Sequence, residues 1–192
     1  SGPPDGPLCY IGADYSRESL DLAEQQVHAF AQKLPFQLAT GLSADQFLKT
    51  SWLHIDWHSP LPLTDGSIQR ILCHLSLSFS PSPLHSLRKM LRVLHPDGRA
   101  VITVLQPHAD LTTLFHRHLR ASAQDQFGTS AQILLHHLGR LREAVRHGLL
   151  HSYERNELTR LLAHAGADPI QVVPTLDNQV LLAVIRKGKS TG

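Results

Sequence analysis

The chain has 192 residues, of which 42% are hydrophobic and 18% are charged, a composition typical of a globular domain with a sizeable core. Its 18 Lys and Arg residues nearly balance 16 Asp and Glu residues, and the formal charge of +2 argues against a nucleic-acid partner. No apolar run reaches the roughly 20 residues of a membrane span, and the first residues do not resemble a signal peptide. We therefore expect a cytoplasmic protein with no membrane partner.

The first predicted elements are two strands that each lead to an acid. Residues 8–14 are mostly apolar, which favours a buried parallel strand ending at Asp14. Ser16 is a favourable N-cap, and the apolar residues that follow it recur at helical spacing. Residues 36–50 allow a short helix near positions 44–48. Residues 52–57, WLHIDW, predict a second strand, which carries Asp56 at its end.

The second half of the chain continues the alternation of strands and helices. Its predicted elements are a strand within 68–79, a helix over 81–94 begun by proline, a tight turn over 95–98, a strand over 99–105, a helical region over 110–150, a helix over 153–166 and two final strands around 177–178. The last two strands are close enough to form an antiparallel hairpin. The order predicts one three-layer α/β domain over residues 1–192, with a mostly parallel sheet.

Two cysteines and fourteen histidines bear on redox and metal chemistry. Cys9 and Cys73 both lie in apolar runs, and we interpret them as reduced thiols in the core rather than a disulfide or a metal pair. The histidines lack a spacing that would complete a ligand set with a carboxylate or cysteine, so we predict no metal site.

The acids at the strand ends are the candidate binding residues. Ligands of open α/β sheets bind at the carboxyl ends of the strands, where an acid can accept hydrogen bonds from a ribose diol. Asp14 suits that role, although it could merely precede the helix cap. Asp56 adds a second acid at the same edge, and the ring of Trp57 follows it. An acid of this kind can accept from an adenine amino group.

Four segments in this order resemble the class I S-adenosylmethionine-dependent methyltransferases of the methyltransferase-type-11 kind. They are DYS and the following helix (14–23), the acid at 56 with LPL and DGSI (61–68), LRKMLRVLHPDGRAVI (87–102), and the last helix with its strand pair (157–187). The third segment is similar to the family's RVLKPGG helix, turn and strand. The resemblance covers roughly residues 9–187 and implies a Rossmann-like methyltransferase fold with S-adenosylmethionine as the cofactor.

The same resemblance implies roles for individual residues. Asp14, with Tyr15 beside it, would hold the ribose hydroxyls of the cofactor. Asp56 would accept from the adenine amino group, with Trp57 against the ring. Cys73 and His74 would line the methionine side and the methyl group, and residues 106–110 would face the substrate. His74 is also a candidate general base, because imidazole titrates near neutrality, or else a histidine packed at a strand end.

One departure from the family leaves two functions open. The family's first strand and Gly-rich turn would precede residue 8, and Gly2, Gly6 and Gly12 do not form a G-x-G-x-x-G at a strand–helix junction. We therefore expect the domain to lack its N-terminal βα unit, which upstream sequence or a partner chain would supply. The resemblance favours an enzyme that methylates a small molecule. The alternative is a non-catalytic methyltransferase-like binding or assembly protein, and a homodimer stays open.

Overall fold

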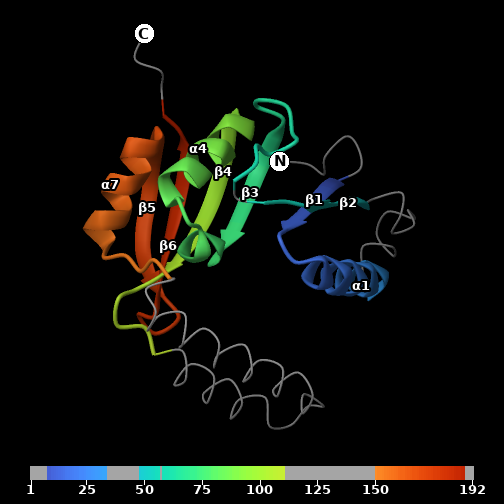
Figure 1. Cartoon of the computed structure of the whole chain (residues 1–192), viewed down its shortest axis with the longest axis horizontal. Helices are drawn as coiled ribbons and strands as arrows, with labels where there is room; N and C mark the ends of the chain where they lie inside the picture. Colours follow the sequence, from blue (N-terminus) through green and yellow to red (C-terminus); the bar gives the residue numbers. More distant parts are fainter. Residues whose placement is uncertain (1–7, 34–47, 57, 111–149, 189–192) are drawn as a thin grey trace. The chain divides into compact units, whose positions relative to one another are not determined.

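The computed structural model describes residues 8–33, 48–56, 58–110 and 150–188, which fall into two units (Figure 1). The N-terminal unit is Ser1–Ser59 and the C-terminal unit is Pro60–Gly192. Trp57, most of the short helix expected near residues 44–48 and most of the helical region expected over 110–150 lie outside the described residues. The expected helix is wrong at Leu48, which begins a strand over 48–54 instead of the strand expected over 52–57. Among the described helices, none is both long and apolar enough to cross a membrane.

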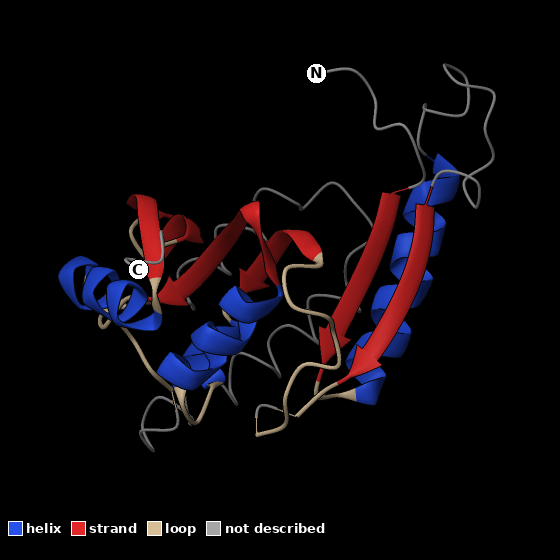
Figure 2. Ribbon diagram, turned by 90° about the horizontal axis from the view of Figure 1, so that it is seen from above, coloured by secondary structure: helices blue, strands red, loops and turns tan. Residues whose placement is uncertain are grey.

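The N-terminal unit contains one β-α-β motif. Strands β1 (Leu8–Asp14) and β2 (Leu48–His54) pair in parallel along their whole length, and helix α1 (Arg17–Lys33) connects them in the chain order. Figure 2 shows the two strands side by side with α1 running along them. A parallel pair needs such a crossover, because a short turn cannot return the chain to the starting edge.

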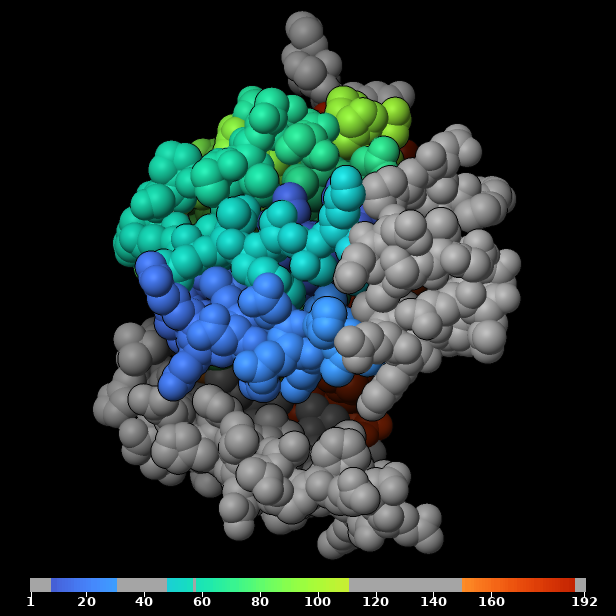
Figure 3. All heavy atoms as spheres, turned by 90° about the vertical axis from the view of Figure 1, so that its right-hand side faces the viewer, coloured from blue at the N-terminus to red at the C-terminus, as the bar shows by residue number. Residues whose placement is uncertain are grey.

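Helix α1 begins where the sequence predicts. The hydroxyl of Ser16 accepts a hydrogen bond from the N–H of Ser19 at 3.2 Å, and the carbonyl of Ser16 accepts from Leu20 at 3.1 Å. These bonds confirm Ser16 as the N-cap. Of the apolar residues in the helix, Leu20 is buried, whereas Leu22 and Phe30 are exposed. The helix presents most of its described side chains at the surface (Figure 3).

Strand β1 is parallel, as predicted, but the prediction that it is buried is wrong. Its first three residues are exposed, and Gly12 is its one buried residue. The expectation that both cysteines lie in the core is accordingly wrong for Cys9, which is exposed, and correct for Cys73. Among the described residues, β1 packs with one strand, β2, and one helix, α1, which are too few partners to bury every side chain.

The C-terminal unit is built on a four-stranded sheet. Its order is β3 (Ile68–His74), β4 (Leu94–Leu105), β6 (Val180–Lys187) and β5 (Ala167–Thr175). Strand β3 is parallel to β4, and β6 is antiparallel to both β4 and β5. The antiparallel hairpin expected at the end of the chain is therefore confirmed.

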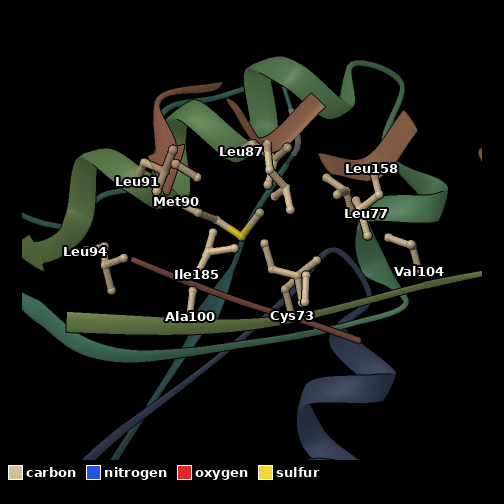
Figure 4. Close-up of a cluster of buried hydrophobic side chains, with 14 of the residues drawn as sticks. Cys73, Leu77, Leu87, Met90, Leu91, Leu94, Ala100, Val104, Leu158 and Ile185 are labelled. Atoms are coloured by element: carbon tan, nitrogen blue, oxygen red, sulfur yellow. The ribbon is translucent and has the colours of Figure 1, made fainter. Parts of the chain in front are cut away.

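Two helices of the C-terminal unit pack together over the core of this sheet. They are α4 (Pro83–Val93), which begins with a proline two residues later than the predicted start at residue 81, and α7 (Arg155–Ala165), which ends at the left-handed Gly166. Leu87, Met90, Leu158 and Leu162 contribute to a buried cluster with residues of β4 and β6, part of which Figure 4 shows. Each fully buried leucine contributes about 1.5–3 kcal/mol relative to an exposed one.

Two boundaries in the C-terminal unit differ from the prediction. Strand β3 ends at His74 rather than near Phe79, because Leu75 adopts a left-handed conformation (φ 55°) and a 3-10 helix, η1 (Ser76–Phe79), follows. Strand β4 starts at Leu94 and includes the residues expected to form a tight turn. The register passes from Ile68–Leu94 to Arg70–Arg99, so the residues over 95–98 form a bulge in the strand.

Candidate functional site

The N-terminal unit brings Asp14 and Asp56 to one edge of its sheet. Asp14 pairs with His54 in the register of β1 and β2. The N–H of Ile55 then donates to the carbonyl of Asp14 at 2.9 Å, which extends the ladder by one step. Asp56 follows directly. The predicted juxtaposition of the two acids at the carboxyl ends of neighbouring strands is therefore present within this unit.

Asp14 stabilises the turn into α1 with one oxygen and keeps the other available. Its Oδ1 accepts the N–H of Ser16 at 2.8 Å, two residues along the chain. Among the described residues, its Oδ2 has no hydrogen-bond partner. The carboxylate is half-buried, so a ligand donor that reaches Oδ2 would compete with less water than at an open surface. One oxygen of Asp14 therefore supports the start of the helix, and the other is available to accept a hydrogen bond from a ligand.

Asp56 has the same division between its two oxygens. Its Oδ1 accepts the N–H of His58 at 2.9 Å, and its backbone carbonyl accepts the N–H of Ser59 at 3.1 Å. These bonds form a turn of the kind that aspartate favours. Within the described part of the chain, Oδ2 of Asp56 has no hydrogen-bond partner. Asp56 is exposed, so this remaining acceptor is open to hydrogen bonding.

His54 belongs to this edge, and the sequence analysis missed it. Its Nε2 lies 2.8 Å from the carbonyl oxygen of Tyr15, so the Nε2–H donates to that carbonyl. The bond joins the end of β2 to the turn after β1, and it leaves the Tyr15 side chain 69% exposed. The only signal in the sequence was a polar residue two places before Asp56 in a predicted strand.

Beneath this edge, Gly12 and Trp52 are matched in size. They are register partners, and a Cβ atom built on Gly12 would lie 2.1 Å from Cζ3 of Trp52. Tyr10 meets the same indole edge-on, with ring centroids 5.6 Å apart. The glycine therefore leaves the space that the indole occupies. This packing holds β2 against β1 just before the two acids.

Cys73 and His74 are the last two residues of strand β3 in the C-terminal unit, and they differ in burial. The thiol of Cys73 is 6% exposed and lies among apolar side chains (Figure 4). Burial raises its pKa to about 11, so it stays protonated at neutral pH. His74 is exposed, and its Nδ1 lies 2.8 Å from the hydroxyl of Thr103 on β4. Any contact of the Cys73 side chain with a ligand is limited to its small exposed part.

No group of three or more His, Cys, Asp or Glu residues that could hold a metal ion occurs within residues 8–33, 48–56, 58–110 and 150–188. The acceptors at the sheet edge of the N-terminal unit suit a ligand that offers hydroxyl or amino groups. Two carboxylates at one sheet edge, each with one oxygen bound to its own turn, can accept such donors with the other oxygen.

The sequence matches a family model described as a methyltransferase domain over residues 6–102, which is half of the chain. No curated protein gives a significant match.

Solved structures share the fold at low sequence identity. An S-adenosylmethionine-dependent methyltransferase from Aquifex aeolicus is 13% identical, with a TM-score of 0.54 over 91% of this chain and 66% of its own. A putative methyltransferase from Bacillus halodurans is 12% identical, with a TM-score of 0.58 over 95% of this chain and 84% of its own. A putative methyltransferase from Haloferax volcanii, solved with the activator Trm112, is 14% identical, with a TM-score of 0.51 over 93% and 71%. The chain thus spans just under two thirds of the Aquifex protein.

Proposed function

The chain belongs to the S-adenosylmethionine-dependent methyltransferase family, and we propose that it binds this cofactor and serves methyl transfer to a small-molecule acceptor. The solved structures support the Rossmann-like methyltransferase fold, with parallel strands and an antiparallel strand pair at the C-terminal end. The observation that carries the proposal is the placement of Asp14 and Asp56 at the ends of neighbouring parallel strands.

The two acids fit the adenosine part of the cofactor. A ribose diol and an adenine amino group are hydrogen-bond donors, and Oδ2 of each acid is an acceptor with no other partner among the described residues. In the proposal, Asp14 accepts from the ribose hydroxyls and Asp56 accepts from the adenine amino group. Tyr15, whose side chain is exposed beside Asp14, and Trp57 would provide aromatic surface at the same edge.

The bound cofactor supplies a methyl group on a sulfonium, which needs little further activation. The protein must then hold the acceptor in line with the methyl group and exclude water. We assign the end of β3, with Cys73 and His74, to that part of the site on the basis of the family resemblance. A general base is required only if the acceptor carries a proton at pH 7.

A non-catalytic methyltransferase-like binding or assembly protein is the alternative. The two functions differ in whether an N-terminal βα unit with its Gly-rich turn is supplied in the working protein. In the described residues, β3 has one strand neighbour, β4, and β1 has one strand neighbour, β2. We propose that a further strand, from upstream sequence or from a partner chain, pairs with β3 and with β1 in the working protein. The Haloferax neighbour was solved with an activator protein, which is one precedent for a partner chain.

A titration separates these functions. Isothermal calorimetry with S-adenosylmethionine and S-adenosylhomocysteine should show saturable binding to the chain if it forms the adenosine site by itself. If only a longer form of the protein, extended at its N-terminus, shows saturable binding, the upstream sequence supplies the further strand. If strands 8–14 and 70–76 pair directly in that longer form and neither compound binds, the non-catalytic function replaces the enzymatic one.

A further inference from the structure

The hydroxyl of Thr103 contacts the ring of His74 and also accepts a hydrogen bond from the backbone N–H of the next residue, Leu75. The register pairs His74 with Thr103 across β3 and β4, and Oγ1 of Thr103 lies 2.8 Å from Nδ1 of His74. The N–H of Leu75 donates to the same Oγ1 at 3.0 Å and to the carbonyl of Thr103 at 3.0 Å. One threonine of β4 therefore contacts two consecutive residues at the end of β3.

The backbone at this point adopts a conformation that most residues avoid. Leu75 has a φ of 55°, in the left-handed region, which costs about 1–2 kcal/mol for a residue with a Cβ. The two hydrogen bonds from its N–H to Thr103 offset that cost. Ser76 adds a bond from its hydroxyl to the carbonyl of His74 at 3.1 Å. Hydrogen bonds from side chains thus stabilise the turn after His74, at a left-handed position where glycine is the usual residue.

The hydrogen bonds around Thr103 decide which nitrogen of His74 carries the proton. A threonine hydroxyl donates one hydrogen bond and accepts up to two. Because the N–H of Leu75 donates to Oγ1, the hydroxyl hydrogen needs an acceptor, and Thr103 is 6% exposed. Within the described part of the structure, Nδ1 of His74 is the one acceptor recorded for it. If Nδ1 carried the proton, the buried hydroxyl hydrogen would have no acceptor, which costs about 1–3 kcal/mol.

We propose that Thr103 is a positioning residue that fixes neutral His74 with its proton on Nε2, so that His74 presents a hydrogen-bond donor at the end of β3. The ring nitrogen that could take a proton, Nδ1, is then occupied by the Thr103 hydroxyl. His74 in this form binds an oxygen acceptor, such as a carbonyl or a carboxylate, rather than acting as a general base through Nε2. The tautomer follows from the fold of the C-terminal unit, whereas its use in binding rests on the proposed function.

Nitrogen-15 NMR of histidine side chains, recorded in alkaline buffer where the rings are neutral, tests this assignment without any ligand. His74→Gln identifies the His74 signals among those of the other histidines. We expect Nδ1 of His74 to give the signal of an unprotonated nitrogen and Nε2 that of a protonated one. Thr103→Ser should keep this pattern, because it keeps the hydroxyl. Thr103→Val should shift His74 toward a mixture of tautomers, while the carbonyl at position 103 still accepts from Leu75.

Two outcomes overturn the proposal. One is a proton on Nδ1 of His74 in the unsubstituted protein. The other is a His74 pattern that does not change in Thr103→Val while circular dichroism shows the protein folded. If Thr103→Val does not fold, the pattern in the unsubstituted protein and in Thr103→Ser still decides the assignment. A failure to bind S-adenosylmethionine would count against the proposed function and leave the tautomer measurement valid.

Discussion

The N–H of Ile55 donates to the carbonyl oxygen of Asp14 at 2.9 Å, one step past the last paired residues of β1 and β2. This bond places Asp56, the next residue, at the same sheet edge as Asp14. The arrangement depends on the register of the two strands, because a shift of one residue would turn the side chains to the opposite face. Tests of the register are therefore tests of the site.

We expect Gly12→Ala to destabilise the N-terminal unit by about 1–3 kcal/mol, the usual cost of overpacking. The new methyl group would lie 2.1 Å from Cζ3 of Trp52, so the indole must move. Urea unfolding followed by circular dichroism measures the change. In Gly12→Ala/Trp52→Leu the smaller side chain leaves room, and the loss should be less than the sum of the single losses. Strictly additive losses would contradict this account of the packing.

Arg92→Ala should lower the free energy of unfolding by about 1–3 kcal/mol, because the Arg92 guanidinium donates hydrogen bonds to backbone carbonyls of the segment before β3. Its Nη2 donates to the carbonyl of Leu61 at 2.7 Å and its Nη1 donates to that of Leu63 at 2.9 Å. Arg92 also pairs with Asp65, whose side chain is largely exposed. Asp65→Asn is the matched control and should cost less than about 1 kcal/mol. Equal losses in the two variants would assign the stabilisation to the ion pair instead.

The two cysteines should differ in reactivity toward iodoacetamide. Burial raises the pKa of the Cys73 thiol to about 11, so its reactive thiolate appears only as the pH rises toward that value. Cys9 is exposed. At pH 8, peptide mass spectrometry should find Cys9 modified well before Cys73, and both modified at similar rates in denaturant. Similar rates in the folded protein would show that Cys73 is accessible.

Cofactor binding should change the fluorescence of Trp57 if this residue and Asp56 frame the adenine. The chain has two tryptophans, so a Trp52→Phe background isolates Trp57. We expect S-adenosylhomocysteine to quench or shift the remaining emission along a saturable curve. Saturable binding by calorimetry with no response from Trp57 would place the adenine elsewhere.

The elements that follow local rules were predictable from sequence. Ser16 caps α1 through its own side chain, and Gly166 ends α7 with a φ of 90°. The hairpin of β5 and β6 follows from two β-rich runs around Asp177 and Asn178, which both have positive φ. In each case residues close together in the sequence determine the conformation.

The features that depend on distant residues could not be predicted. Strand β3 ends early because Leu75 is held by Thr103, 28 residues later in the sequence. His54 contacts the carbonyl of Tyr15 across 39 positions. The exposure of Cys9 depends on how many elements cover β1, and its apolar neighbours in the sequence do not reveal that number. Asp14 was predictable because it ends a strand, and Asp56 because it follows closely after one. The hydrogen bond from one oxygen of each acid to its own turn was not predictable from the sequence.

Calorimetric titration of Asp14→Asn with S-adenosylhomocysteine tests the central claim most directly. The asparagine Oδ1 can still accept the N–H of Ser16, so the turn into α1 is kept, while the acceptor proposed for the ribose hydroxyls becomes an amide donor. Asp21→Asn, on the exposed face of α1, is the matched control. We predict that Asp14→Asn and Asp14→Ala each lose about 1–3 kcal/mol of binding free energy, with Asp21→Asn unchanged. Unchanged affinity in a folded Asp14→Asn protein would contradict the assignment of Asp14 to the cofactor.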